Sequence, residues 1–148
     1  MNAAGGSSGP PAAGARPAGS AVRILIWVVQ ALLIVTFGYT GFVKTTRPIT
    51  ELARTMVWPG AVPPALVRFI GLCEMAGSLG LLLPSVTRIL PVLSPIAAIG
   101  LATIMALAIP FHISRGEASV IPLHFILGGL ALFVAWGRLK RAPIPARH

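Results

Sequence analysis

The 148-residue chain has few charged residues and almost no acidic ones. Charged residues make up 10% of the chain, and only Glu51, Glu74 and Glu117 carry carboxylates. A soluble domain of ordinary composition has about 25% charged residues. The scarcity of charge, together with 55% hydrophobic residues, excludes an ordinary soluble domain and indicates a polytopic membrane protein.

Cysteine is also nearly absent, because Cys73 is the single cysteine of the sequence. One cysteine excludes an intramolecular disulfide, a CxxC redox pair and a cysteine-rich metal site. We interpret Cys73 as a small packing residue in a helix, and we expect no metal site.

Basic residues outnumber acidic ones and give a net charge of +9. Most of them lie at the ends of apolar runs and do not form one continuous stripe. This distribution is typical of the positively charged flanks of membrane helices and disfavours nucleic-acid binding. We therefore expect the lipid bilayer, and not nucleic acid, as the partner of this chain.

The sequence divides into three segments. Residues 1–20 are rich in Ala, Gly, Ser and Pro and cannot form a core, so we expect a disordered tail. Residues 21–138 form the predicted four-transmembrane domain, and residues 139–148 form a basic C-terminal tail.

Four apolar runs are each long enough to cross a bilayer, which takes about 20 residues in a helix. The predicted spans are residues 22–43, 64–83, 92–113 and 119–136. The loop after the first span carries an apolar stripe at helical spacing, formed by Ile49, Leu52, Ala53 and Met56. We predict an all-α, integral membrane, antiparallel four-helix bundle with a short interfacial helix after span one. The basic flanks favour cytoplasmic termini.

Glu74 is the unusual residue of the second span. It lies about 12–15 Å from the Pro64 end, and a charge at such depth costs about 3 kcal/mol or more without a partner. Gly71 and Ser78 share its helical face, so another helix can approach closely there. We expect Lys44, at the end of span one, or a histidine from another helix to pair with it.

The other candidate site residues gather in the same half of the bundle, which the predicted topology makes the outer half. They are Lys44, Arg68, His112 and His124, and the opposite half contributes almost nothing ionisable. Each histidine follows a proline by two residues, so we expect helix distortions beside both. The pattern predicts an outer-side polar pocket, roofed by the loop after span one, with candidate ligand-binding residues Lys44, Arg68, Glu74, His112 and His124.

Three short motifs occur in a recognisable order: FGYTGFVK at residues 37–44, GLCEMAG at residues 71–77 followed by LLLP, and His112 at the end of span three. In this order they resemble the DoxX-like family of small bacterial membrane proteins, over residues 22–137. The resemblance implies a multi-pass protein of the bacterial inner membrane, with family polar positions at Lys44, Glu74 and His112. The wider group includes a subunit of an archaeal thiosulfate:quinone oxidoreductase.

The sequence leaves several functions open. The first hypothesis is an accessory protein of membrane redox metabolism that binds a quinone or lipid headgroup, with no catalytic activity of its own. The alternatives are a transporter of a small molecule or lipid, and a structural subunit that joins a membrane complex or a homo-oligomer. Haem ligation by His112 and His124 is disfavoured, because nothing else in the sequence supports it.

Overall fold

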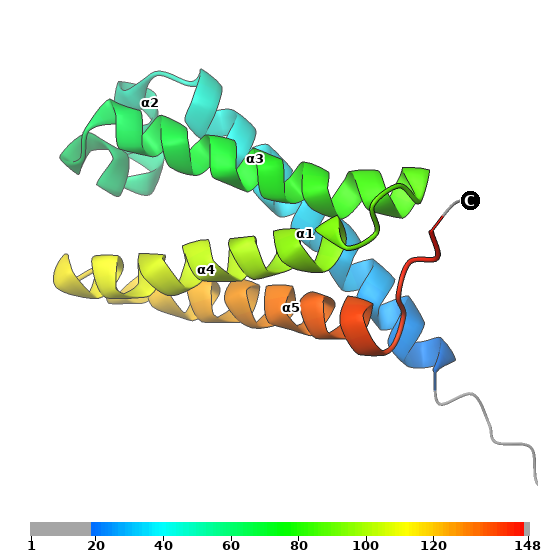
Figure 1. The fold of residues 1–148 in the computed structure, drawn as a ribbon. Helices are drawn as coiled ribbons and strands as arrows, with labels where there is room; N and C mark the ends of the chain where they lie inside the picture. The colour runs from blue at the N-terminus through cyan, green and yellow to red at the C-terminus, as the bar shows by residue number, and fades with distance from the viewer. Residues whose placement is uncertain (1–18, 147–148) are drawn as a thin grey trace, which may run out of the picture.

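The computed structural model describes residues 19–146, and these are helical with no strand among them (Figure 1). The elements in chain order are α1 (Ser20–Thr46), α2 (Ile49–Met56), η1 (Trp58–Ala61), α3 (Pro64–Thr87), α4 (Leu93–Ser114), η2 (Ala118–Val120) and α5 (Ile121–Lys140). Helices α1, α3, α4 and α5 are long and apolar enough to cross a membrane. The protein is therefore a multi-pass membrane protein, as predicted.

The four long helices alternate in direction and form an antiparallel bundle (Figure 1). α1 packs along α3, α4 packs along α5, and contacts between α3 and α4 and between α1 and α5 join the two pairs. α2 and η1 lie at one end, which we call the loop end. Both ends of the described chain lie at the opposite end, which we call the terminal end. The predicted short helix after span one is thus confirmed as α2.

The large apolar side chains lie on both the inside and the outside of the bundle. Phe37, Leu81 and Leu101 are almost fully buried in a core shared by all four long helices. Many others are exposed, among them Ile24, Phe42, Phe69, Leu107 and Phe125. A soluble monomer rarely exposes so many large apolar side chains, whereas a membrane protein exposes them to lipid tails.

Two glycines bring α1 and α3 together near the loop end. A Cβ atom added at Gly41 would lie 2.6 Å from the carbonyl oxygen of Gly71, and one added at Gly71 would lie 2.8 Å from Cβ of Lys44. No larger side chain fits at either position without movement of the backbone. This close approach places the end of α1 directly against the middle of α3, where Glu74 lies.

All four long helices end beyond their predicted last residue, and α3 and α5 extend furthest, by four residues each. α3 continues through Pro84 to Thr87, although we expected it to end at residue 83. A proline inside a helix loses its own N–H hydrogen bond and crowds the carbonyl four residues earlier, yet α3 continues past Pro84. Arg88 then ends the helix in the left-handed conformation (φ 60°), and its N–H donates to the carbonyl of Pro84 at 3.0 Å. α5 continues to Lys140, four residues past its expected end.

Candidate functional site

Lys44 and Glu74 form a buried ion pair between α1 and α3. The Nζ atom of Lys44 lies 2.6 Å from Oε1 of Glu74, and Thr40 donates from its hydroxyl to Oε2 at 3.1 Å. Glu74 is 1% exposed and Lys44 is 8% exposed. The partner of Glu74 is therefore Lys44, the first of the two partners that we expected. Both carboxylate oxygens of Glu74 accept a hydrogen bond.

The Lys44 ammonium retains hydrogen-bonding capacity after it pairs with Glu74. An ammonium has three N–H donors, and within the described chain Glu74 is the only acceptor that Nζ contacts. Nζ also lies 5.8 Å from the ring centroid of Trp58, in cation–π range. Two donors remain for a ligand or water.

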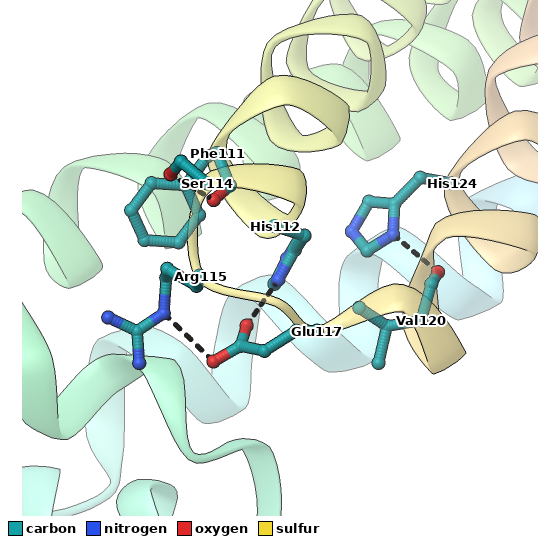
Figure 2. Close-up of polar contacts among 7 residues, drawn as sticks. All are labelled: Phe111, His112, Ser114, Arg115, Glu117, Val120 and His124. Atoms are coloured by element: carbon teal, nitrogen blue, oxygen red, sulfur yellow. Dashed lines mark hydrogen bonds and ion pairs between the residues drawn. The ribbon is translucent and has the colours of Figure 1, made fainter.

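A second cluster of charged residues joins α4 to the turn before α5 (Figure 2). Nδ1 of buried His112 lies 2.6 Å from Oε2 of Glu117, and Nε of Arg115 donates to Oε1 of Glu117 at 2.8 Å. The hydrogen bond from His112 holds the pKa of the Glu117 carboxyl below its usual value; Arg115 lowers it further, against the opposing effect of partial burial. An ionised Glu117 accepts from Nδ1–H, and Nε2 makes no hydrogen bond within residues 19–146.

His124 lies beside His112, with 4.7 Å between the ring centroids (Figure 2). Its Nδ1 lies 2.8 Å from the carbonyl oxygen of Val120, which fixes the ring against the start of α5. The prediction of a helix distortion at Pro122 is wrong, because Pro122 lies in the first turn of α5, where a proline is tolerated. Pro110 does lie inside α4, two residues before His112.

Two cavities meet at these polar groups. One, of about 330 Å³, lies between α3 and α4; its apolar lining includes Leu66, Phe69, Leu107 and Phe111. The other, of about 550 Å³, lies below α2 and η1 against α1 and α5, and Thr40 and Glu117 line it. Both cavities are lined by the same polar residues: Lys44, Trp58, Glu74, His112 and His124.

Four of the five candidate site residues thus meet at the loop end of the bundle. The fifth, Arg68, lines neither of these two cavities, and its guanidinium donates to the carbonyl of Lys44 at the end of α1. Sequence reasoning did not select Thr40 and Glu117. Thr40 precedes Lys44 by four residues and so shares its helix face, a signal that the sequence contains.

A polar cluster at the terminal end was also missed. Gln30 donates to the carbonyl of Leu81 at 2.8 Å and to Oγ of Ser85 at 2.6 Å, while its own Oε1 accepts from Nε of Arg138 at 2.6 Å. Gln30 is 1% exposed and Arg138 is 4% exposed. The expectation that this half contributes almost nothing ionisable is therefore wrong.

The polar groups at the loop end suit an organic ligand better than a metal ion. Within residues 19–146 no three His, Cys, Asp or Glu side chains lie close enough together to hold a metal ion. The ammonium of Lys44 is a hydrogen-bond donor, which matches carbonyl, carboxylate or phosphate oxygens. The Nδ1 atoms of His112 and His124 already contact Glu117 and the Val120 carbonyl, which leaves Nε2 of each ring for a ligand. Aromatic and aliphatic side chains complete the lining of the smaller cavity.

The comparisons with known proteins agree with this architecture. The model of the DoxX-like family matches residues 28–135, a range that includes Lys44, Glu74, His112 and His124. No curated protein and no solved structure matches the chain. Because the family model covers well over half of the sequence and most of each long helix, the chain belongs to the DoxX-like family.

Proposed function

We propose that this protein binds the headgroup of a quinone, or of a similar carbonyl-bearing lipid, in the cavity between α3 and α4. The observation that carries the proposal is the convergence of Lys44, Glu74, His112 and His124 on one apolar-lined cavity. Its volume of about 330 Å³ is at the lower end of the usual range for ligand pockets. A ring-sized headgroup with a tail left outside suits that volume.

The lining of this cavity supports an amphipathic ligand. Leu66, Phe69 and Leu107 line it and are also 42%, 62% and 67% exposed on the surface that faces lipid. A lipid tail can therefore leave the cavity sideways into the bilayer while the headgroup stays inside. Lys44 then donates a hydrogen bond to a headgroup carbonyl oxygen, and His112 offers Nε2 to the ligand.

The cavity below α2 supplies the aqueous side of the proposed site. It is lined by Thr40 and Glu117 as well as by the shared polar residues. Glu74 borders both cavities, so a carboxylate lies between the lipid-facing ligand and the cavity roofed by α2. In the proposed role within membrane redox metabolism, Glu74 exchanges protons with the bound headgroup. In this proposal the electrons come from a redox partner protein in the same membrane, and this chain supplies the headgroup site.

We also propose that the protein lies in a bacterial inner membrane with its terminal end in the cytoplasm. Arg23, Arg88, Arg138 and Arg141 gather at the terminal end, where the described chain has no acidic side chain. At the loop end, Glu51 and Glu117 offset part of the basic charge. This imbalance supports cytoplasmic termini, and with that orientation the proposed headgroup site lies in the outer half.

The test is quantitative mass spectrometry of the quinones that co-purify with the protein. Two variants separate binding from folding. Ala108 lines the cavity, so Ala108→Leu adds three carbons to its wall and narrows it, whereas Ala106→Leu adds the same bulk at an exposed position outside it. The proposal expects quinone enrichment in wild type and in Ala106→Leu, and its loss in Ala108→Leu. Equal quinone contents in all three proteins would exclude this cavity as the site.

A second comparison uses two double variants and tests whether the ion pair of Lys44 and Glu74 is needed for quinone binding. Glu74→Gln/Lys44→Met removes both buried charges, and Arg47→Met/Glu51→Gln removes an exposed pair of the same kind, 3.2 Å apart. The proposal expects the first double variant alone to lose quinone. Retention of quinone by a well-folded Glu74→Gln/Lys44→Met protein would favour a structural role for the pair.

A further inference from the structure

The terminal end of the bundle has a strongly basic pocket that the proposed function does not use. It measures about 580 Å³ and is lined by Arg23 of α1, Arg88 after α3, Arg138 of α5 and Arg141 after α5. These arginines come from three regions far apart in the sequence. The segment after α5 turns away from the helix axis at the terminal end (Figure 1), and its residues Ala142 and Ile144 line the pocket and are buried.

No side-chain carboxylate of this protein neutralises these arginines. The three acidic residues of the whole sequence are Glu51, Glu74 and Glu117. Glu51 pairs with Arg47, Glu74 with Lys44, and Glu117 with Arg115 and His112, all in the loop-end half. The pocket therefore gathers four positive charges and no negative side chain.

Arg138 is the buried centre of this cluster. It is 4% exposed, and its guanidinium lies 3.9 Å from the ring centroid of Trp27. Nε donates to Gln30, and Nη1 donates to the carbonyl of Ala142 at 3.1 Å. Both acceptors are neutral, and buried Nη2 has no hydrogen-bond partner within the described chain. A buried charge without a counter-charge and with an unused donor is unfavourable, so this site favours an anion.

The other three arginines keep their donors free for the same anion. Arg23, Arg88 and Arg141 are exposed, and their side chains make no hydrogen bond or ion pair to residues 19–146. Arg141 lies over the ring of Trp136 at 5.4 Å, which positions it without using its N–H groups. Guanidinium groups recognise phosphate oxygens through paired hydrogen bonds. Several such groups around one pocket match a phosphate group better than a single carboxylate.

We propose that this pocket binds a phosphate group, carried either by an anionic membrane lipid or by a soluble phosphate compound. The lipid source fits the position of the pocket at the ends of the membrane-spanning helices, where phospholipid headgroups lie. Exposed Ile24, Val86 and Ile89 near the same helix ends are apolar enough to contact the acyl chains of such a lipid.

Native mass spectrometry of the full-length protein in detergent tests the proposal. The probes are phosphatidylglycerol, which is anionic, phosphatidylcholine, which has no net charge, and inorganic phosphate. Arg23→Gln/Arg88→Gln removes two exposed arginines of the pocket, and Arg47→Gln/Arg54→Gln removes two exposed arginines at the loop end. The first double variant should bind phosphatidylglycerol at least tenfold more weakly, because a tenfold loss corresponds to about 1.4 kcal/mol, which is no more than one hydrogen bond to a charged group contributes. The loop-end variant should bind it as wild type does.

The three probes distinguish the sources of phosphate. A lipid site retains phosphatidylglycerol in the presence of millimolar inorganic phosphate, whereas a site for soluble phosphate compounds loses it. Bound phosphate of either kind should also raise the melting temperature of wild type more than that of Arg23→Gln/Arg88→Gln. Absence of binding, equal binding of phosphatidylcholine, or equal losses in the two double variants would overturn the proposal.

Discussion

Lys44 and Glu74, thirty residues apart in the sequence, lie 2.6 Å apart inside the bundle, and this pair connects α1 to α3 where the two cavities meet. Neither charge has enough contact with water to remain stable alone, because each side chain is at most 10% exposed. The pair therefore acts on the structure as a unit, and the carboxylate also accepts from Thr40.

The first prediction concerns the coupling of these two charges. Glu74→Gln leaves the Lys44 ammonium buried without its counter-charge and should destabilise the protein by about 3–5 kcal/mol. Adding Lys44→Met removes that lone charge and should recover most of the loss. Thermal unfolding in detergent of the two single variants and the double variant measures the coupling. Additive losses would show that the two side chains act independently.

The second prediction concerns the close approach of α1 and α3. Gly71→Ala places a Cβ 2.8 Å from Cβ of Lys44 and 2.9 Å from the carbonyl oxygen of Gly41, so the helices must separate. We expect a loss of about 1–3 kcal/mol in stability. Gly100 is the matched control, because a Cβ added there meets no atom within 4 Å. If Gly100→Ala is as destabilising as Gly71→Ala, helix contact is not the cause.

The fold was predictable because its main signals are local. Long apolar runs specify the four spans, and the apolar stripe of residues 49–56 specifies α2. Helix ends were less predictable. Pro84 resembles a stop signal, yet a proline can kink a helix without ending it, and α3 continues to Thr87.

The two polar clusters show what a single sequence can and cannot predict. A carboxylate in an apolar span requires a partner, so the pairing of Glu74 with Lys44 was predictable. Arg138 has the position of an ordinary basic flank, and nothing in its neighbourhood indicates burial. Its burial depends on Trp27 and Gln30 of α1, which are tertiary contacts, and on the chain after α5, where the carbonyl of Ala142 accepts from Nη1.

The third prediction concerns membrane orientation. In a Cys73→Ser background, single cysteines at Thr50 in α2 and at Lys140 at the end of α5 report on the two ends, because both positions are exposed. A membrane-impermeant maleimide added to intact cells should label the cysteine at position 50. The cysteine at position 140 should react only after the membrane is permeabilised. The reverse pattern would place the termini outside and the headgroup site in the inner half.

The fourth prediction concerns the response of the loop end to acid. His112 and Arg115 lower the pKa of Glu117 in the folded protein, so the ionised form is favoured by folding. The stabilisation is fully present above the usual glutamate pKa of about 4.3, and it is lost as the pH falls through the lower pKa of the folded state. Glu117→Gln keeps an acceptor oxygen but cannot titrate.

Melting temperatures of wild type and Glu117→Gln, measured in detergent from neutral pH down to about pH 3, test this prediction. Wild type should be the more stable protein at neutral pH, and the difference should shrink below about pH 4.3 as Glu117 gains its proton. The other titratable groups are common to both proteins, so the change in the difference isolates Glu117 and its two partners. A difference that stays constant across the range would mean that the contacts of Glu117 with His112 and Arg115 do not depend on its charge.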